Sequence, residues 1–308
     1  MLCTASTIKD PIDEIEKILI FICPGRSGST LISEVIMEHE FLGWPVHYLE
    51  YAPNLPQLDL LRHQFENKYW RVKGEKALFN KTRFLNAAVP RPTEAYGFWN
   101  SVTRKSINFS RDFLLGETAT YSEKKRIRLA IFKMAKRQGR RSFSFKLTGP
   151  GRIQYLQSIY PHVKFINVYR DPIATVKSLL KIPFWKDLGM SRLWWTGAYT
   201  PVELIDYENL RPDPVTSTAF QVNKILRSIQ HEAQSVDADI LNISYEKLIR
   251  NPEDQCEKIL DFAELPSSEN TSNKLKRTQF YSPPNVNTFT SQQLKKIDGI
   301  FSDFVVSQ

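Results

Sequence analysis

A run of glycine, hydroxyl and arginine residues follows the first apolar segment of the chain. Residues 18–23 are all apolar, and residues 24–30 read Pro-Gly-Arg-Ser-Gly-Ser-Thr. Glycines permit a sharp turn, while hydroxyls, backbone N–H groups and an arginine side chain all donate hydrogen bonds to oxyanions. This composition predicts a loop that holds a phosphate or a sulfate.

A second arginine follows another apolar segment, at 163–168. Arg170 lies at the carboxyl end of this segment, Asp171 is a residue type that caps helices, and Pro172 suits the first helical position. Ser178 lies seven residues past Asp171 (178 − 171), which is about two turns and returns it to the face where the helix begins. Arg170 and Ser178 are therefore expected to bind one anion together.

Alternating strand and helix patterns position these two clusters. The apolar run at 18–23 is typical of a strand buried on both faces of a parallel sheet. A strand that turns through glycines into a helix directs backbone N–H groups and the helix dipole at one point, which favours an anion there. The apolar residues after the loop have helical spacing: Leu31, Ile32, Val35 and Ile36. Further strands are predicted at 142–149, at 163–168 and from 241, each followed by a helix, and Asn251 is expected to cap the helix after the last.

Length and charge set the limits of the interpretation. The 308 residues are 42% hydrophobic and 24% charged, which suits one large α/β domain or two small ones. A net charge of +9 suits a polyanionic ligand, nucleic acid or a membrane surface. The basic segment 124–141 is interpreted as a solvated helix packed on the core, with an acidic acceptor or a membrane surface as the alternative. Residues 55–142 are predicted to be mostly helical, and helices at 219–236 and 291–305 to cover the sheet.

Cysteine usage points to a reducing compartment. Cys3, Cys23 and Cys256 are few, odd in number and widely spaced, so neither a disulfide framework nor a zinc site is predicted. The first residues lack a basic segment followed by an apolar stretch, and no run approaches the ~18 apolar residues of a membrane span. We therefore expect a cytoplasmic protein without a transmembrane segment, for which peripheral membrane contact stays open.

The two anion-binding stretches resemble motifs of one enzyme family. The loop at 24–30 resembles the 5′-phosphosulfate loop of sulfotransferases that use 3′-phosphoadenosine-5′-phosphosulfate (PAPS). Arg170 with Ser178, and the Arg-Asp-Pro sequence that begins at Arg170, resemble the 3′-phosphate motif of the same enzymes. The segment 241–265 is similar to their Tyr-Glu-Asp-Leu-x-x-x-Pro element. The layout is nearest to trehalose 2-sulfotransferase-like bacterial enzymes and general sulfotransferase domains.

This resemblance implies a fold and a donor site. The fold would be α/β, a single P-loop-type domain over 1–308 with a mainly parallel central sheet flanked by helices. Residues 1–14 would be a lead-in, and 181–218 an insertion on the acceptor side. PAPS would leave as 3′,5′-diphosphoadenosine. The residues implied in donor binding are Arg26, Ser27, Gly28, Ser29, Thr30, Arg170, Ser178, Tyr245, Thr278 and Phe280.

The resemblance also implies catalytic residues. Lys146 would lie near the bridging oxygen of the donor, together with Arg26. In cytosolic relatives a histidine base follows that lysine by two positions, but Thr148 stands there in this chain. His47 occupies the place of a glutamate in the Gly-x-Pro-x-Glu-Tyr segment of the trehalose-type enzymes, so His47 or Glu50 is expected to be the general base.

The implied reaction moves a sulfuryl group to an acceptor hydroxyl, on a small molecule, carbohydrate or glycolipid. The aromatic-rich segment 181–210 would line the acceptor pocket or belong to the core. No metal is expected. A small-molecule kinase is the alternative enzyme, disfavoured because the loop lacks the Gly-Lys pair that serves a transferring γ-phosphate. A non-catalytic protein that binds adenine nucleotides or nucleic acid is the third possibility, although no nucleic-acid module is recognised.

Overall fold

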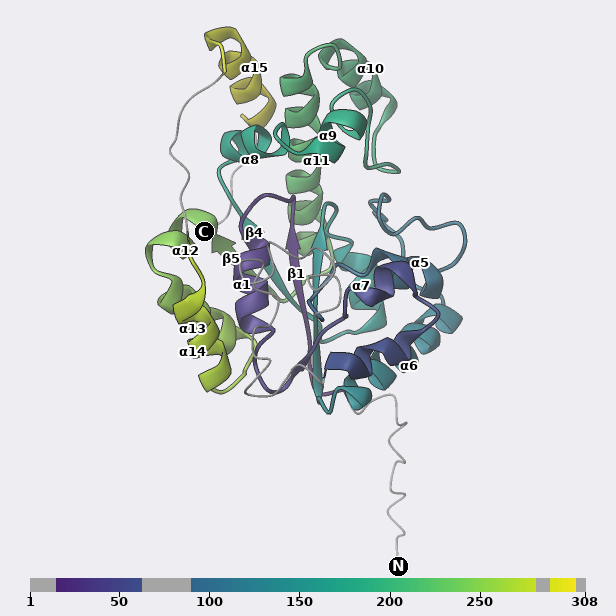
Figure 1. Cartoon of the computed structure of the whole chain (residues 1–308). Coiled ribbons are helices and arrows are strands. Elements are labelled where there is room, and N and C mark those ends of the chain that lie inside the picture. Colours follow the sequence, from purple (N-terminus) through teal and green to yellow (C-terminus); the bar gives the residue numbers. More distant parts are fainter. Residues whose placement is uncertain (1–14, 63–89, 281–288, 303–308) are drawn as a thin grey trace, which may run out of the picture.

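The first strand of the chain lies at the centre of a parallel sheet. The structure is a computed structural model that describes residues 15–62, 90–280 and 289–302 (Figure 1). In this part of the chain five strands follow the order β2-β3-β1-β4-β5, and every neighbouring pair is parallel. The strands are β1 (Ile18–Cys23), β2 (Leu42–Gly43), β3 (Ser142–Thr148), β4 (Lys164–Tyr169) and β5 (Ile240–Ser244). The expected α/β fold with a parallel sheet is confirmed.

Strand register brings the chemically active residues to one edge of the sheet. Cys23 pairs with Thr148, and Phe21 with Lys146, so the loop after β1 begins beside the end of β3. Tyr169 pairs with Ser244, so Arg170 and Tyr245 follow adjacent strand ends. Ligands of open parallel sheets bind at this carboxyl edge.

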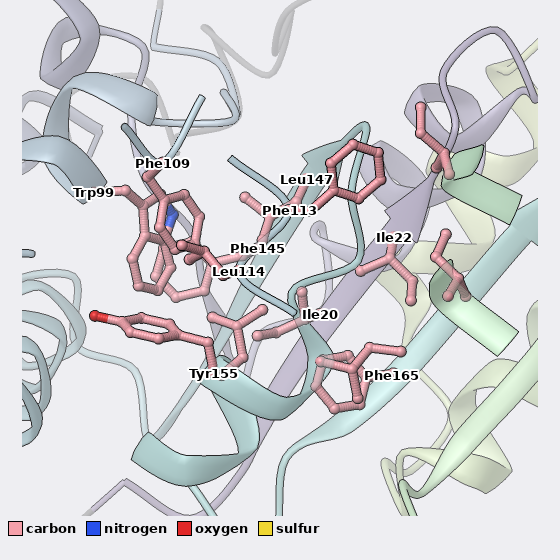
Figure 2. Close-up of a cluster of buried hydrophobic side chains, with 14 of the residues drawn as sticks. Ile20, Ile22, Trp99, Phe109, Phe113, Leu114, Phe145, Leu147, Tyr155 and Phe165 are labelled. Carbon is pink, nitrogen blue, oxygen red and sulfur yellow. The ribbon is translucent and has the colours of Figure 1, made fainter. Parts of the chain in front are cut away.

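Side chains of β1 alternate between two separate cores. Ile18, Ile20 and Ile22 belong to one core, while Leu19 and Phe21 belong to the other. Helices cover both sheet faces, which is why every residue of β1 is buried. Figure 2 shows the larger core, where the rings of Trp99 and Phe109 stack with centroids 4.6 Å apart.

Helices that share each core lie on the same side of the sheet in Figure 1. One side carries α1 (Ser29–Ile36), α12 (Tyr245–Arg250), α13 (Pro252–Phe262) and α14 (Glu269–Arg277). The other carries α5 (Tyr96–Val102), α6 (Tyr121–Arg137), α7 (Ile153–Ile159) and α11 (Pro214–Ser235). The remaining described helices are α2 (Tyr48–Tyr51), η2 (Pro56–Leu60), α8 (Pro172–Leu179), α9 (Pro183–Leu188), α10 (Pro201–Leu210) and α15 (Ser291–Phe301).

Two predicted helix starts have different outcomes. Asp171 caps α8 as expected, because its carboxylate accepts a hydrogen bond of 2.7 Å from the backbone N–H of Ala174, and Pro172 is the first helical residue. Asn251 stands at the N-cap position of α13, but its side chain makes no capping hydrogen bond. The expectation that the Asn251 side chain caps this helix is therefore wrong.

The stretch predicted to be mostly helical contains a long irregular segment. Between α5 and α6, residues 103–120 form turns rather than a helix. This segment buries Phe109 and Phe113 in the larger core without helical spacing, so its apolar residues misled a pattern-based prediction. The two-residue strand β2 is too short to leave a pattern. The predictions for 1–14 and for 63–89 lie outside the described residues.

Candidate active site

The loop after β1 adopts a conformation that depends on glycine. Gly25, Arg26 and Gly28 all have positive φ, at 94°, 58° and 79°. A Cβ on Gly28 would lie 2.3 Å from the ring of Tyr245, so no side chain fits there. Successive left-handed residues at the start of α1 curl the chain around a concave site lined by backbone N–H groups, a geometry that suits an anion.

Three hydroxyls of this loop have different surroundings. The Ser27 hydroxyl is buried and makes no hydrogen bond within the described residues. The Ser29 hydroxyl lies 2.9 Å from the Sγ of Cys23, and that of Thr30 accepts from Lys146 Nζ at 3.3 Å. Buried polar groups rarely stay without a partner, so an anion in the loop would satisfy Ser27.

Two arginines meet beside the loop. Arg26 Nε donates to Ser178 Oγ at 3.1 Å, and Arg170 donates to the carbonyl oxygen of Arg26 at 3.4 Å. The Arg170 guanidinium also lies 4.6 Å from the ring centre of Tyr245. Within the described residues neither arginine has a carboxylate partner. The structure therefore brings four of the expected donor-binding residues into one cationic corner (hereafter the donor corner: Arg26, Arg170, Ser178 and Tyr245).

A cavity of about 450 Å³ has Arg170 in its lining. Its lining includes the acidic residues Asp171, Glu246 and Asp298. Glu246 accepts from the backbone N–H of Asp171 at 3.1 Å, and Asp171 caps α8. These carboxylates would repel a phosphate, so the side of Arg170 that faces Arg26 and Ser178 is the one that suits an anion.

Thr278 and Phe280 lie at the end of α14, which packs against α1. The Thr278 hydroxyl donates to the carbonyl oxygen of Lys274 at 2.8 Å. Phe280 packs against the smaller core, which contains Phe21. Their predicted place beside the purine stays a prediction.

Lys146 connects the loop to a carboxylate. Its Nζ lies 3.3 Å from Thr30 Oγ1 and donates to Glu94 Oε1 at 2.6 Å. Burial lowers the pKa of Lys146, but the charge and hydrogen bond of Glu94, together with nearby Cys23 and Glu34, outweigh burial, and the net pKa is raised. Lys146 is thus a cation at neutral pH, positioned beside the loop as expected.

The two expected bases lie on the segment around α2. The Glu50 carboxylate accepts from Thr93 Oγ1 at 3.0 Å and from the backbone N–H groups of Tyr96 and Gly97 at 3.0 and 3.1 Å. Glu50 therefore holds the start of α5, where a carboxylate also interacts favourably with the helix dipole. The ring of His47 is buried and lies 4.2 Å from that of Tyr48, between centroids.

Sequence reasoning missed Glu94. Its Oε1 accepts from Lys146 Nζ and from the Thr148 hydroxyl. The Tyr96 hydroxyl donates to the Thr148 carbonyl oxygen at 2.6 Å and accepts from the Thr148 N–H at 3.0 Å, which fixes the end of β3 against this segment. Glu94 precedes Lys146 by 52 residues and belongs to no motif, so no local signal marks it.

The aromatic segment contributes more to the core than to an open pocket. Trp185 and Trp195 are buried, and Trp185 Nε1 donates to Thr218 Oγ1 at 2.9 Å. Trp195 also touches the end of β3, because a Cβ on Gly149 would lie 2.4 Å from its Nε1. The core alternative therefore holds for these two tryptophans. Trp194 is half-buried with Arg111 over its ring at 5.0 Å, and Tyr199 is likewise half-buried.

Comparisons with known proteins test the family that the two motifs indicate. A family model described as "Sulfotransferase family" matches residues 18–269. The sulfotransferase STF9 of Mycobacterium avium is similar in structure, with 17% identity and a TM-score of 0.56, over 94% of this chain and 76% of that one. The sulfotransferase STF1 of Mycobacterium tuberculosis is 12% identical with a TM-score of 0.49, over 94% and 78%. Mouse SULT7A1, solved in complex with PAP, is 10% identical with a TM-score of 0.45, over 93% and 83%. Comparison with curated proteins gave no match.

The family model covers more than half of the chain, so this protein belongs to the sulfotransferase family. The likeness to STF9 shows the same fold. The family inferred from the two anion-binding motifs is confirmed, and its class of reaction is sulfuryl transfer. This favours sulfuryl transfer over both the kinase and the non-catalytic binding protein.

Two features are absent from the part of the chain that the structure describes, residues 15–62, 90–280 and 289–302. Within these ranges no helix is long and apolar enough to cross a membrane. The same residues contain no group of three or more His, Cys, Asp or Glu side chains arranged to hold a metal ion.

Proposed function

We propose that this chain transfers the sulfuryl group of PAPS to an acceptor hydroxyl of a carbohydrate or glycolipid. The observation that carries the proposal is the donor corner, where Arg26 and Arg170 meet Ser178 and lack carboxylate partners among the described residues. Adjacent cations repel each other, and an anion bound between the exposed Arg26 and the half-buried Arg170 would offset that repulsion. PAPS offers a 5′-phosphosulfate and a 3′-phosphate, the two anionic groups that the corner and the loop require.

Each group of residues has a distinct part in this proposal. The loop N–H groups, Arg26 and the hydroxyls of residues 27, 29 and 30 hold the 5′-phosphosulfate. Arg170 and Ser178 bind the 3′-phosphate, while Tyr245, Thr278 and Phe280 contact the adenine. The bound donor supplies an activated sulfuryl group. Lys146 and Arg26 stabilise the negative charge that develops on the bridging oxygen.

A radiolabel experiment tests this function directly. Transfer of ³⁵S from labelled PAPS, with no transfer of ³²P from γ-labelled ATP, supports it. Kinases need Mg²⁺ to bridge the β- and γ-phosphates, whereas sulfuryl transfer by these residues should survive EDTA. ATP-dependent labelling that EDTA abolishes and Mg²⁺ restores would establish the kinase instead.

The acceptor class rests on half-buried aromatic side chains of the segment 181–210. Trp194 and Tyr199 are two of them, and aromatic rings of this kind suit the apolar face of a sugar ring. A screen of PAPS turnover against sugars, glycolipids, phenols and small alcohols tests the class. Turnover confined to phenols or small alcohols would reject a carbohydrate acceptor.

A cytoplasmic location with peripheral membrane contact also belongs to this proposal. Cys23 and Cys256 are buried free thiols, which suits a reducing compartment. A groove of about 660 Å³ over α5 and α6 has Lys125 and Lys133 on its rim and Phe98 in its lining. Cosedimentation with vesicles tests this contact: binding to vesicles with phosphatidylserine should exceed binding to neutral ones and fall in Lys125→Glu/Lys133→Glu.

A further inference from the structure

We propose that Glu94 is the general base that takes the proton from the acceptor hydroxyl. This inference rests on the proposed sulfuryl transfer and replaces His47 and Glu50 in that role. It follows from the position of the Glu94 carboxylate, from its two oxygens having different surroundings, and from the way Glu50 is used elsewhere.

Position is the first argument. Thr30 of the loop contacts Lys146 Nζ at 3.3 Å, and the same Nζ contacts Glu94 Oε1 at 2.6 Å. Glu94 is thus separated from the anion loop by one side chain, at the carboxyl end of β3 where Thr148 ends the strand. A base must lie within hydrogen-bond reach of an oxygen that approaches the loop, and this carboxylate lies beside that approach.

The two carboxylate oxygens of Glu94 have different surroundings. Oε1 accepts from Lys146 and from the Thr148 hydroxyl, which holds the side chain in place. Oε2 makes no hydrogen bond within the described residues, and the side chain is 25% exposed. One oxygen is therefore anchored while the other is open to receive a proton, as a positioned base requires.

Glu50 is arranged differently. Both of its oxygens accept hydrogen bonds, one from Thr93 and Tyr96 and the other from Gly97. These donors hold the carboxylate against the start of α5. Protonation of Glu50 during turnover would break the capping of α5, so its structural role conflicts with that of a base.

The proposed proton transfer balances with the reaction. The acceptor O–H bond breaks and its proton passes to Glu94 Oε2, while the acceptor oxygen forms a new bond to sulfur. The bond between sulfur and the bridging oxygen breaks, and its electron pair stays on that oxygen beside Lys146. Glu94 then returns its proton to solvent.

The test compares Glu94→Gln with Glu50→Gln and with a control, Glu16→Gln. Glu16 is half exposed, precedes β1 at the opposite end of the sheet from the loop, and faces only Arg141 at 3.6 Å. Steady-state turnover of ³⁵S-PAPS is measured from pH 5 to pH 9 with the best acceptor of the screen. Glu94→Gln should lower kcat by about 10²- to 10⁴-fold. Its affinity for 3′,5′-diphosphoadenosine and its melting temperature should stay near wild type, which shows that the variant folds.

A second readout separates a base from a merely structural residue. A phenol of low pKa needs less help to lose its proton, so the loss in Glu94→Gln should be smaller with 4-nitrophenol than with an alcohol. A near-normal kcat in Glu94→Gln would overturn the assignment, and so would a loss of kcat confined to Glu50→Gln. If the wild-type chain transfers no sulfur from PAPS while it binds the nucleotide, the proposed function itself fails, and the base falls with it.

Discussion

The donor corner and the proposed acceptor side of the site, Lys146 with Glu94, are built in different ways. Arg170 directly follows β4, and Arg26 lies three residues after the end of β1; each precedes a helix by a few residues. On the acceptor side, Lys146 meets Glu94, which comes from a segment that precedes α5. The donor corner is a product of short motifs next to core strands. The acceptor side depends on a contact between segments far apart in the chain.

This difference fits the demands of the two halves of the reaction. Every enzyme that binds the same donor needs cations and N–H groups at the same strand ends, where a parallel sheet places them. The acceptor varies, and loops can change without disturbing the core. We make four predictions from this difference. One concerns a residue that contacts both sides, and the others concern residues in one part of the molecule alone.

The largest effect is expected at Lys146, which touches both sides. Lys146→Met keeps the length of the side chain but removes the cation that faces the bridging oxygen. We expect kcat to fall by about 10²- to 10³-fold, as for removal of one donor from a charge-stabilising site. Nucleotide affinity, measured by calorimetry, should change far less. Lys146→Arg, which retains a cation, is the matched control, and an equal loss in both variants would argue against a charge effect.

The next effect belongs to the donor corner alone. Arg170→Ala removes a charge-assisted hydrogen bond to the 3′-phosphate, worth about 1.5–3 kcal/mol, so affinity for 3′,5′-diphosphoadenosine should fall about ten- to a hundredfold. Affinity for AMP, which lacks that phosphate, should hardly change. Calorimetry with both nucleotides measures the difference. Equal affinity of the wild-type protein for the two would contradict the 3′-phosphate role.

Gly28→Ala tests how the loop depends on backbone shape. The new Cβ would lie 2.3 Å from the Tyr245 ring at a φ of 79°. We expect a loss of about 1–3 kcal/mol in the free energy of unfolding, measured by urea denaturation. A Tyr245→Ala background removes the clash, so the additional cost of Gly28→Ala should be smaller there. Additive costs in the double variant would mean that the ring does not set the limit.

The last prediction concerns a buried carboxylate on α11. Glu232 on α11 accepts from the backbone N–H of Gln154 at 3.4 Å, its Oε2 has no hydrogen-bond partner among the described residues, and burial raises its pKa from 4.5 to about 7. Because the folded protein binds this proton more tightly than the unfolded chain, its stabilising contribution is full below pH 4.5. It is lost as the pH rises through about 7, by an amount of about 3 kcal/mol.

Thermal melts from pH 4 to pH 8 measure this contribution. The melting temperature should decrease by several degrees over that range beyond the change of a Glu232→Gln variant. The variant should have a flatter profile whatever its absolute melting temperature. Parallel profiles for the two proteins would show that Glu232 does not titrate in this range.

Local sequence was sufficient to predict the central strands and the two arginines of the donor corner. A run of six apolar residues is a strand covered on both faces wherever it occurs in an α/β chain. Glycines at positive φ and the Asp171-Pro172 start of α8 are equally local, because a few bonds decide them. Arg26 and Arg170 could therefore each be assigned to an anion site before any tertiary contact was known.

The position of Glu94 beside Lys146 became known only from the tertiary structure. Glu94 meets Lys146 because β3 and the segment before α5 pack together, and no spacing in the chain reports that contact. Glu50 had the residue type of a base, yet packing of α2 against α5 turned its carboxylate toward backbone N–H groups. Residue type limits the chemistry that a side chain can perform, but hydrogen-bond partners from distant segments decide whether that chemistry is available.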